Sequence, residues 1–149
     1  MISLSEAARL NGNLKASRAA LNEARPLVAK SAELYLRGRL QYQGSRLLAS
    51  EGKPNEALRS YQQLITLIET IKGRLGSQEQ NGIAENYTFI YDELVALLYS
   101  MSKSSPKSQL DFASTALEYA EKNKARQFAE SWGRVFKSHM ALSLPTSFR

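Results

Sequence analysis

The sequence predicts an all-α fold of about six helices, arranged as successive antiparallel hairpins. Apolar residues recur at steps of three and four along most of the chain, which is the period of a helix with one buried face. The chain has only four prolines and eight glycines, and most of them stand where a helical pattern ends. No segment alternates between apolar and polar residues, so no sheet is expected.

The first half of the chain predicts helices separated by Gly12, Pro26 and Gly52. Gly12 interrupts the first helical pattern. Pro26 is expected to separate the second helix from the third, because the residue before a proline is disfavoured in the α region. Gly52 suits the left-handed position after a helix, and Pro54 suits the first position of the next. These two residues therefore predict a sharp turn.

The second half predicts three helices, over residues 55–72, 78–102 and 107–138. Gly73 to Gly76 ends the first of them, and Ser77 to Gln80 matches a capping box. Ser104-Ser105-Pro106 separates the second from the third. Apolar residues mark the expected core face of these helices: Ala57, Tyr61, Leu64, Ile65, Ile68 and Ile71; then Ile83, Tyr87, Ile90, Leu94, Leu97 and Met101, beside Ala84, Tyr91, Val95 and Leu98; then Ala113, Leu117, Ala120, Phe128, Trp132 and Val135.

An internal repeat is indicated by Gly12 and Gly52, each of which stands between two amphipathic helical patterns. After Gly52, Ala57 precedes Tyr61 by four positions. In a tetratricopeptide hairpin the second helix packs a small residue against the first helix and an aromatic one against the next hairpin. Ser45 supplies the small residue expected where the two helices cross. The spacing between the two glycines exceeds the usual period of about 34 residues, which predicts longer helices.

Three segments, taken in order, resemble a known arrangement: ALRSYQQLITLIETIKGRLGS (57–77), FIYDELVALLY (89–99) and ALEYAEKNKARQFAE (116–130). Together they look like the tetratricopeptide region that precedes the protease-like domain of bacterial CHAT proteins, the caspase-related family associated with tetratricopeptide repeats. The matching positions are Glu69 to Lys72, Tyr91, Leu94, Ala116, Leu117, Glu118, Glu121, Lys124, Ala125 and Arg126.

The resemblance implies a tetratricopeptide-like scaffold over residues 1–142, followed by a tail or linker over 143–149. Members of this family usually continue into a catalytic domain with a His-Cys pair. This chain has no cysteine and one histidine, His139, so no catalytic residue carries over. The resemblance also implies that Arg126 has a structural role.

Composition excludes several kinds of site. Without cysteine there is no disulfide, thiolate nucleophile or Cys-based zinc site. No P-loop, GxGxxG or zinc motif occurs, and a lone His139 lacks the partners that catalysis requires. We therefore expect no enzyme activity, no cofactor and no metal. No apolar run is long enough for a membrane span, and a cytoplasmic location is expected.

The positive charge is uneven. Residues 1–75 hold 12 Lys/Arg and six Asp/Glu, whereas residues 76–149 hold eight of each. A basic half attracts nucleic acid, anionic lipid or acidic peptide, but the basic residues stand singly, as on a solvated helix surface. A basic helical nucleic-acid-binding protein is therefore the alternative to a protein-interaction scaffold.

Arg39, Tyr42 and Arg46 are the predicted partner-binding residues. Their spacing places them on one face of a helix, which in a tetratricopeptide array would line the concave groove. Two guanidinium groups around an aromatic ring can hold a carboxylate or an acidic peptide. The alternative is that both arginines are solvated and Tyr42 packs against the adjacent helix.

Phe128, Trp132 and Phe136 form a second predicted surface, near the end of the last helix. If the last hairpin leaves an apolar face uncovered, these residues are available to a second copy or to a flanking protease-like domain. The expected partner is thus a peptide or protein, with a homodimer through the C-terminal helix as a further expectation.

Overall fold

The computed structural model describes the backbone of residues 1–74 and 77–143, and the side chains of residues 1–74, 87–129, 131, 132 and 135. Over these residues the fold is all-α and contains no strand, as the sequence predicted. The elements are α1 (Ile2–Leu10), α2 (Leu14–Ala29), α3 (Leu34–Ser50), α4 (Pro54–Arg74), α5 (Ser77–Ser104), the short 3-10 helix η1 (Pro106–Ser108) and α6 (Gln109–Ser143).

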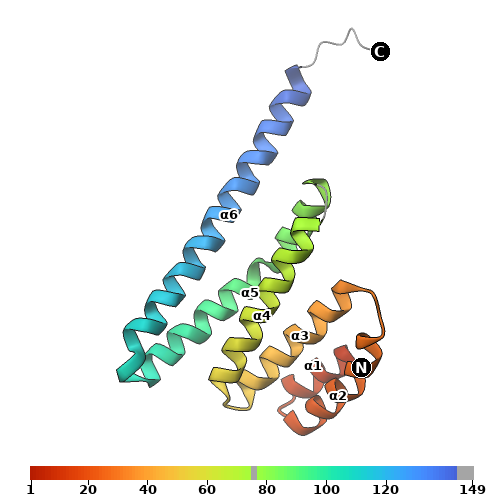
Figure 1. The fold of residues 1–149 in the computed structure, drawn as a ribbon, viewed down its shortest axis with the longest axis vertical. Helices are drawn as coiled ribbons and strands as arrows, with labels where there is room; N and C mark the ends of the chain where they lie inside the picture. The colour runs from red at the N-terminus through yellow and green to blue at the C-terminus, as the bar shows by residue number, and fades with distance from the viewer. Residues whose placement is uncertain (75–76, 144–149) are drawn as a thin grey trace.

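The helices pack in chain order, each against the next, and α1 also contacts α3. Figure 1 shows them following one another from α1 and α2 at one side to the long α6 at the other. The main core lies where α4, α5 and α6 meet. Its buried members are Tyr61, Leu64, Ile65, Ile68, Ile90, Tyr91, Leu94, Leu98 and Ala116.

The structure turns at Gly12 and Gly52, where the sequence predicted breaks, and Gly52 has the left-handed geometry that was predicted for it. Both glycines adopt positive φ, +75° and +73°, which other residues rarely adopt. Pro54 is the first residue of α4, where its missing amide hydrogen costs no helical hydrogen bond. Asn13 caps α2 by accepting a hydrogen bond from the Ala16 amide at 3.0 Å.

The two N-terminal hairpins each cross at a pair of hydrogen-bonded serines. Ser5 and Ser17 are 2.8 Å apart between α1 and α2, and Ser45 and Ser60 are 2.8 Å apart between α3 and α4. A small side chain at each crossing lets the helix backbones approach closely. The buried positions of the two hairpins also correspond at one constant spacing, the same as that from Gly12 to Gly52: Ser5 and Ser45, Ser17 and Ala57, Leu21 and Tyr61, Ala24 and Leu64, Val28 and Ile68.

The predicted break at Pro26 is wrong, because α2 continues through this residue to Ala29. Pro26 lies in the last turn, where its ring removes only one amide donor from the helix. Val28 is buried beyond it and holds this turn against the core. The chain leaves the helix at Lys30, and α3 begins after Glu33.

The predicted core face of the last helix is also wrong. Leu117, Phe128, Trp132 and Val135 are exposed, whereas Ala116 and Asn123 are buried on the opposite side. The spacing of these apolar residues is helical, but period alone does not reveal which face meets the neighbouring helix. α6 also extends beyond the predicted end at 138. The expected capping box at Ser77 to Gln80 and the tail after Ser143 lie outside the described side chains.

Candidate partner-binding groove

A groove of about 640 Å³ runs between α1, α3 and α5. Along α3, Tyr35, Arg39, Tyr42 and Arg46 follow one another at steps of four, three and four, so their side chains share one helix face. The predicted residues Arg39, Tyr42 and Arg46 therefore lie together. The whole lining is Glu6, Tyr35, Gly38, Arg39, Tyr42, Gln43, Arg46, Tyr87, Phe89 and Ile90.

Two of the lining residues, Tyr42 and Arg46, contact a carboxylate of the chain itself. Glu93, on α5, accepts hydrogen bonds from the hydroxyls of Tyr42 at 2.8 Å and Tyr61 at 2.7 Å. The Nε of Arg46 lies 3.7 Å from the same carboxylate. Glu93 thus joins α3, α4 and α5, and it occupies the place between Tyr42 and Arg46 where a ligand carboxylate was expected.

Arg46 is also engaged from the other side. Its Nη1 lies 3.1 Å from Glu6 on α1, and its guanidinium stands 5.2 Å from the ring centre of Tyr42. Two carboxylates and one aromatic ring therefore surround this cation. Arg46 acts as a link between α1, α3 and α5.

The tyrosines around Glu93 are held in their protonated form. Burial, followed by the hydrogen bond to Glu93, raises the pKa of Tyr42 and of Tyr61 well above the ordinary value of 10.0. Both hydroxyls therefore remain hydrogen-bond donors across the neutral range.

Arg39 lies in the open part of the groove. Its guanidinium stands 6.0 Å from the ring centre of Tyr35, and no described carboxylate lies within ion-pair distance of it. Tyr35 is 59% exposed, and Phe89, which packs edge-on against Tyr42 at 5.3 Å, is 43% exposed. One cation and two exposed aromatic rings thus face the groove without a partner carboxylate from the described chain.

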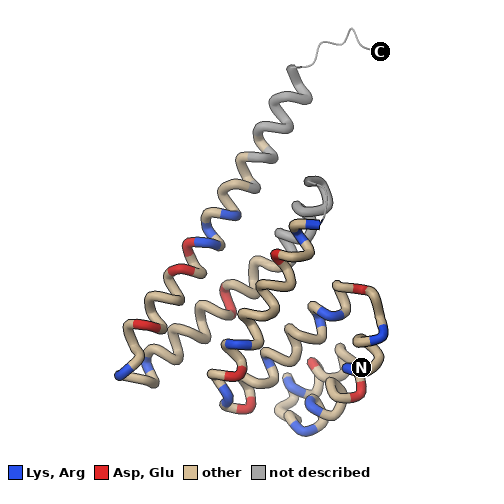
Figure 2. Tube along the Cα trace, viewed as in Figure 1, with Lys and Arg blue, Asp and Glu red and all other residues tan. Residues whose placement is uncertain are grey.

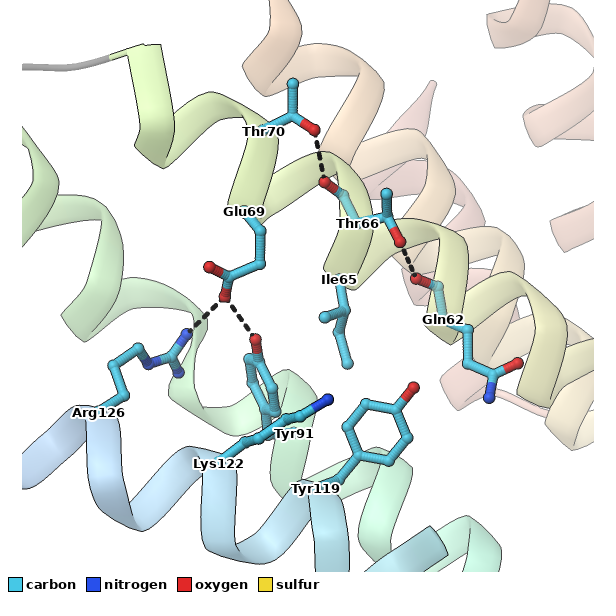
Figure 3. Close-up of a pocket in the computed structure, with 9 residues that line it drawn as sticks. All are labelled: Gln62, Ile65, Thr66, Glu69, Thr70, Tyr91, Tyr119, Lys122 and Arg126. Atoms are coloured by element: carbon cyan, nitrogen blue, oxygen red, sulfur yellow. Dashed lines mark hydrogen bonds and ion pairs between the residues drawn. The ribbon is translucent and has the colours of Figure 1, made fainter.

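A second pocket, of about 780 Å³, lies between α4, α5 and α6 and is shown in Figure 3. Tyr91 donates a hydrogen bond to Glu69 at 2.7 Å, and Arg126 Nη1 lies 3.6 Å from the same carboxylate. The Arg126 guanidinium also stands 4.4 Å from the ring centre of Tyr91. Burial and Glu69 raise the pKa of Tyr91 above its ordinary value. This group repeats the tyrosine–glutamate–arginine contact of Glu93 one hairpin further on.

The sequence did not single out Glu93 or Glu69 as the centres of these groups. Each is an ordinary charged residue on an amphipathic helix, and its partners come from other helices. Tyr42 and Glu93 are 51 positions apart, and Tyr91 and Glu69 are 22 apart. Only the packing of the helices brings them together.

The structure describes two of the three side chains in the predicted terminal surface. Phe128 and Trp132 are exposed and pack edge-on against each other at 6.0 Å. The side chain of Phe136 lies outside the described residues, as does that of His139.

No described group of His, Cys, Asp or Glu residues has the arrangement of a metal site. Over the described helices, none combines the length and apolar character needed to cross a membrane. Figure 2 shows the Lys and Arg positions spread over several helices and interleaved with Asp and Glu. Comparison of the chain with protein-family models, curated proteins and solved structures gives no match.

Proposed function

We propose that this chain is a non-catalytic protein-interaction scaffold of tetratricopeptide type that holds an acidic peptide segment in the groove between α1, α3 and α5. The observation that carries the proposal is the open half of that groove. There Arg39 and the exposed rings of Tyr35 and Phe89 lie beside one another, and no described carboxylate pairs with Arg39.

The arrangement of the helices supports this proposal. In a tetratricopeptide array the first helix of each hairpin lines the concave surface, and the groove here is lined by α1, α3 and α5, the first helices of three successive hairpins. The buried positions of the first two hairpins recur at a fixed spacing, as expected of repeats.

The chemistry of the open half favours a peptide with a carboxylate next to an apolar or aromatic side chain. A guanidinium holds a carboxylate through two parallel hydrogen bonds, and aromatic rings accept apolar side chains. Because Arg46 is already paired with Glu6 and Glu93, we assign the recognition of the carboxylate to Arg39 alone. If the chain belongs beside a CHAT-like protease domain, an acidic segment of that domain is the proposed occupant.

A labelled peptide of alternating Asp and Phe, titrated with the chain and followed by fluorescence anisotropy, tests the proposal. Binding should weaken when each Asp is replaced by Asn. Arg39→Gln should raise the Kd about tenfold, the order expected for one charge-assisted contact. Arg37→Gln is the matched control, because it removes the same charge from another face of α3. An equal loss of affinity in the two variants would mean that the peptide is held only by general electrostatic attraction.

Nucleic-acid binding is the competing function, supported by the basic first half of the chain. Electrophoretic mobility with single-stranded RNA at two salt concentrations separates the two. Binding through several phosphates falls steeply with salt, and Arg37→Gln and Arg39→Gln would then weaken it alike. Absence of a shift at low salt would remove this interpretation.

A further inference from the structure

An apolar stripe runs along the exposed face of α6. The exposed fractions are 84% for Leu110, 62% for Leu117, 66% for Phe128, 58% for Trp132 and 54% for Val135. Large apolar side chains standing in one line, rather than singly, are unusual on the surface of a monomer. The stripe includes Ala113 and is interrupted only at its centre, by Glu121 and Lys124.

The stripe follows a repeat of 11 residues. Leu110, Glu121 and Trp132 are 11 apart, as are Ala113, Lys124 and Val135, and so are Leu117 and Phe128. Eleven residues complete almost exactly three helical turns, so these side chains stay on one face over about 38 Å at a rise of 1.5 Å per residue. The buried Ala116 and Asn123 lie on the opposite face.

The stripe is also symmetric about the midpoint between Lys122 and Asn123. Positions at equal distance from this midpoint match in character, apolar with apolar and acidic with basic. The pairs are Leu110 with Val135, Ala113 with Trp132, Leu117 with Phe128, and Glu121 with Lys124.

We propose that two copies of the chain associate through α6, with the two helices antiparallel and a two-fold axis at this midpoint. In that register Leu117 of one copy packs on Phe128 of the other, and Ala113 leaves room for Trp132. Glu121 of one copy meets Lys124 of the other, once on each side of the axis. Within one copy these two side chains are 3.7 Å apart and both are more than half exposed, so they are available to exchange partners.

The symmetry identifies the occupant. A two-fold interface is isologous, so each position must be complementary to its own symmetry mate. A foreign helix or an adjoining domain requires no such order of residues. A shallow groove of about 490 Å³ between α5 and α6 is lined by Ala113 and Leu117 of the stripe and adds the exposed Tyr99 to the same surface.

Sedimentation equilibrium of the full 149-residue chain tests the association. A monomer–dimer equilibrium is expected, and the emission of Trp132, the only tryptophan, should shift to shorter wavelength with the same midpoint as the chain is concentrated. Phe128→Ala should raise the dimer Kd at least about tenfold, since symmetry removes two contacts at once. Leu27→Ala is the matched control, because Leu27 is 59% exposed on α2.

The register is tested by two charge variants, Glu121→Lys and Lys124→Glu. Each alone places like charges opposite each other at both symmetric contacts, so its dimer should weaken about tenfold. An equimolar mixture should form a heterodimer of about wild-type affinity, because opposite charges then meet again. The ion pair within each copy stays broken in the mixture, so its loss cannot explain the recovery. Circular dichroism should be unchanged throughout.

A chain that stays monomeric up to about 1 mM would overturn the proposal, since a dimer Kd above that concentration is too weak for a specific dimer. A dimer that is unaffected by Phe128→Ala would place the interface elsewhere. Failure of the mixed charge variants to recover the affinity would rule out this register. A positive result leaves the peptide groove untouched, because its lining residues lie on α1, α3 and α5.

Discussion

Glu93 is the residue at which the polar contacts between helices converge. Two tyrosine hydroxyls and one guanidinium from α3 and α4 approach its carboxylate, which is only 31% exposed. Hydrogen bonds to a charged group contribute more than neutral ones, and a donor left buried without its acceptor is costly. Glu93 therefore stabilises the junction between the second and third hairpins.

Glu93→Gln should lower the free energy of unfolding by about 1–3 kcal/mol, because an amide accepts less strongly and brings a donor toward two hydroxyl donors. Urea denaturation followed by circular dichroism measures this change. Glu118→Gln, at an exposed position of α6, is the control and should change stability by less than about 0.5 kcal/mol. Equal effects of the two substitutions would mean that the convergence on Glu93 contributes nothing.

Glu51 makes the stability of the fold sensitive to acid. Arg18 donates to it from Nε at 2.6 Å and also from Nη2, and these hydrogen bonds hold the pKa of Glu51 below its ordinary value of 4.5. A depressed carboxyl pKa stabilises the folded state fully above the unfolded value. That contribution is lost as the pH falls from 4.5 through the lower folded pKa.

Glu51→Gln should therefore flatten the loss of stability below pH 4.5 relative to the wild type. Urea denaturation at a series of pH values measures this difference. A Glu51→Gln profile that runs parallel to that of the wild type would contradict the role given to Arg18.

At the scale of the elements, the turn at Gly52 fixes how α3 and α4 meet. Its φ of +73° lies in the left-handed region, where a side chain is strained whatever space surrounds it. A Cβ added there meets no atom within 4 Å, so any loss of stability on substitution arises from the backbone alone.

Gly52→Ala should destabilise the chain by about 1–2 kcal/mol for that reason. Gly44→Ala is the opposite case: this glycine lies inside α3, and a Cβ there also meets no atom within 4 Å. That substitution should stabilise by about 0.5–1 kcal/mol, because alanine loses less backbone entropy in a helix. Thermal unfolding of the two variants measures whether Gly52→Ala lowers and Gly44→Ala raises the stability. Higher stability of Gly52→Ala would show that the turn tolerates another conformation.

The elements that local chemistry dictates were predicted well from the sequence. Gly12, Gly52 and Pro106 marked real turns, because positive φ and a missing amide hydrogen act within a few residues. The prediction that Pro26 ends a helix was wrong, because the burial of Val28 outweighs the preference of the residue before a proline for an extended backbone. For α6 the period was right but the face was wrong, since an apolar stripe looks the same whether it meets the chain or solvent.

The sequence predicted only the part of the candidate site that lies on a single helix. The spacing correctly placed Arg39, Tyr42 and Arg46 on one face of α3. It could not show that Glu93, from another hairpin, pairs with two of them, because the register between helices depends on the packing of whole side chains. Of these three residues, only Arg39 faces the open part of the groove, as the sequence predicted for all three.

On the scale of the whole molecule, Arg126 ties the last helix to the rest. Its side chain is 14% exposed, stacks over Tyr91 of α5 and lies 3.6 Å from Glu69 of α4. It also donates a hydrogen bond to the buried Asn123, which in turn donates to Asp92 of α5. α6 is thus held by a cation that contacts both preceding helices.

Arg126→Ala should lower the free energy of unfolding by about 1–3 kcal/mol, through lost packing and lost attraction to the tyrosine ring. Lys15→Ala, at an exposed position of α2, is the control. Chemical denaturation followed by circular dichroism measures this change. An unfolding midpoint that is unchanged by Arg126→Ala would show that α6 is held by its apolar contacts with α5 alone.

The serine pairs at the two N-terminal crossings bear on how such a chain can change in length. Ser5 and Ser45 occupy equivalent places, and the buried Val28 and Ile68 are separated by the same number of positions. A tandem duplication or a deletion of one whole unit, from Ser5 to the position before Ser45, would create a boundary of a kind that already exists between α2 and α3. A length change of any other size inside these helices would move a serine of one helix out of register with the serine it contacts on the other. Viable insertions within the helices of these two hairpins should therefore come in whole units of that size.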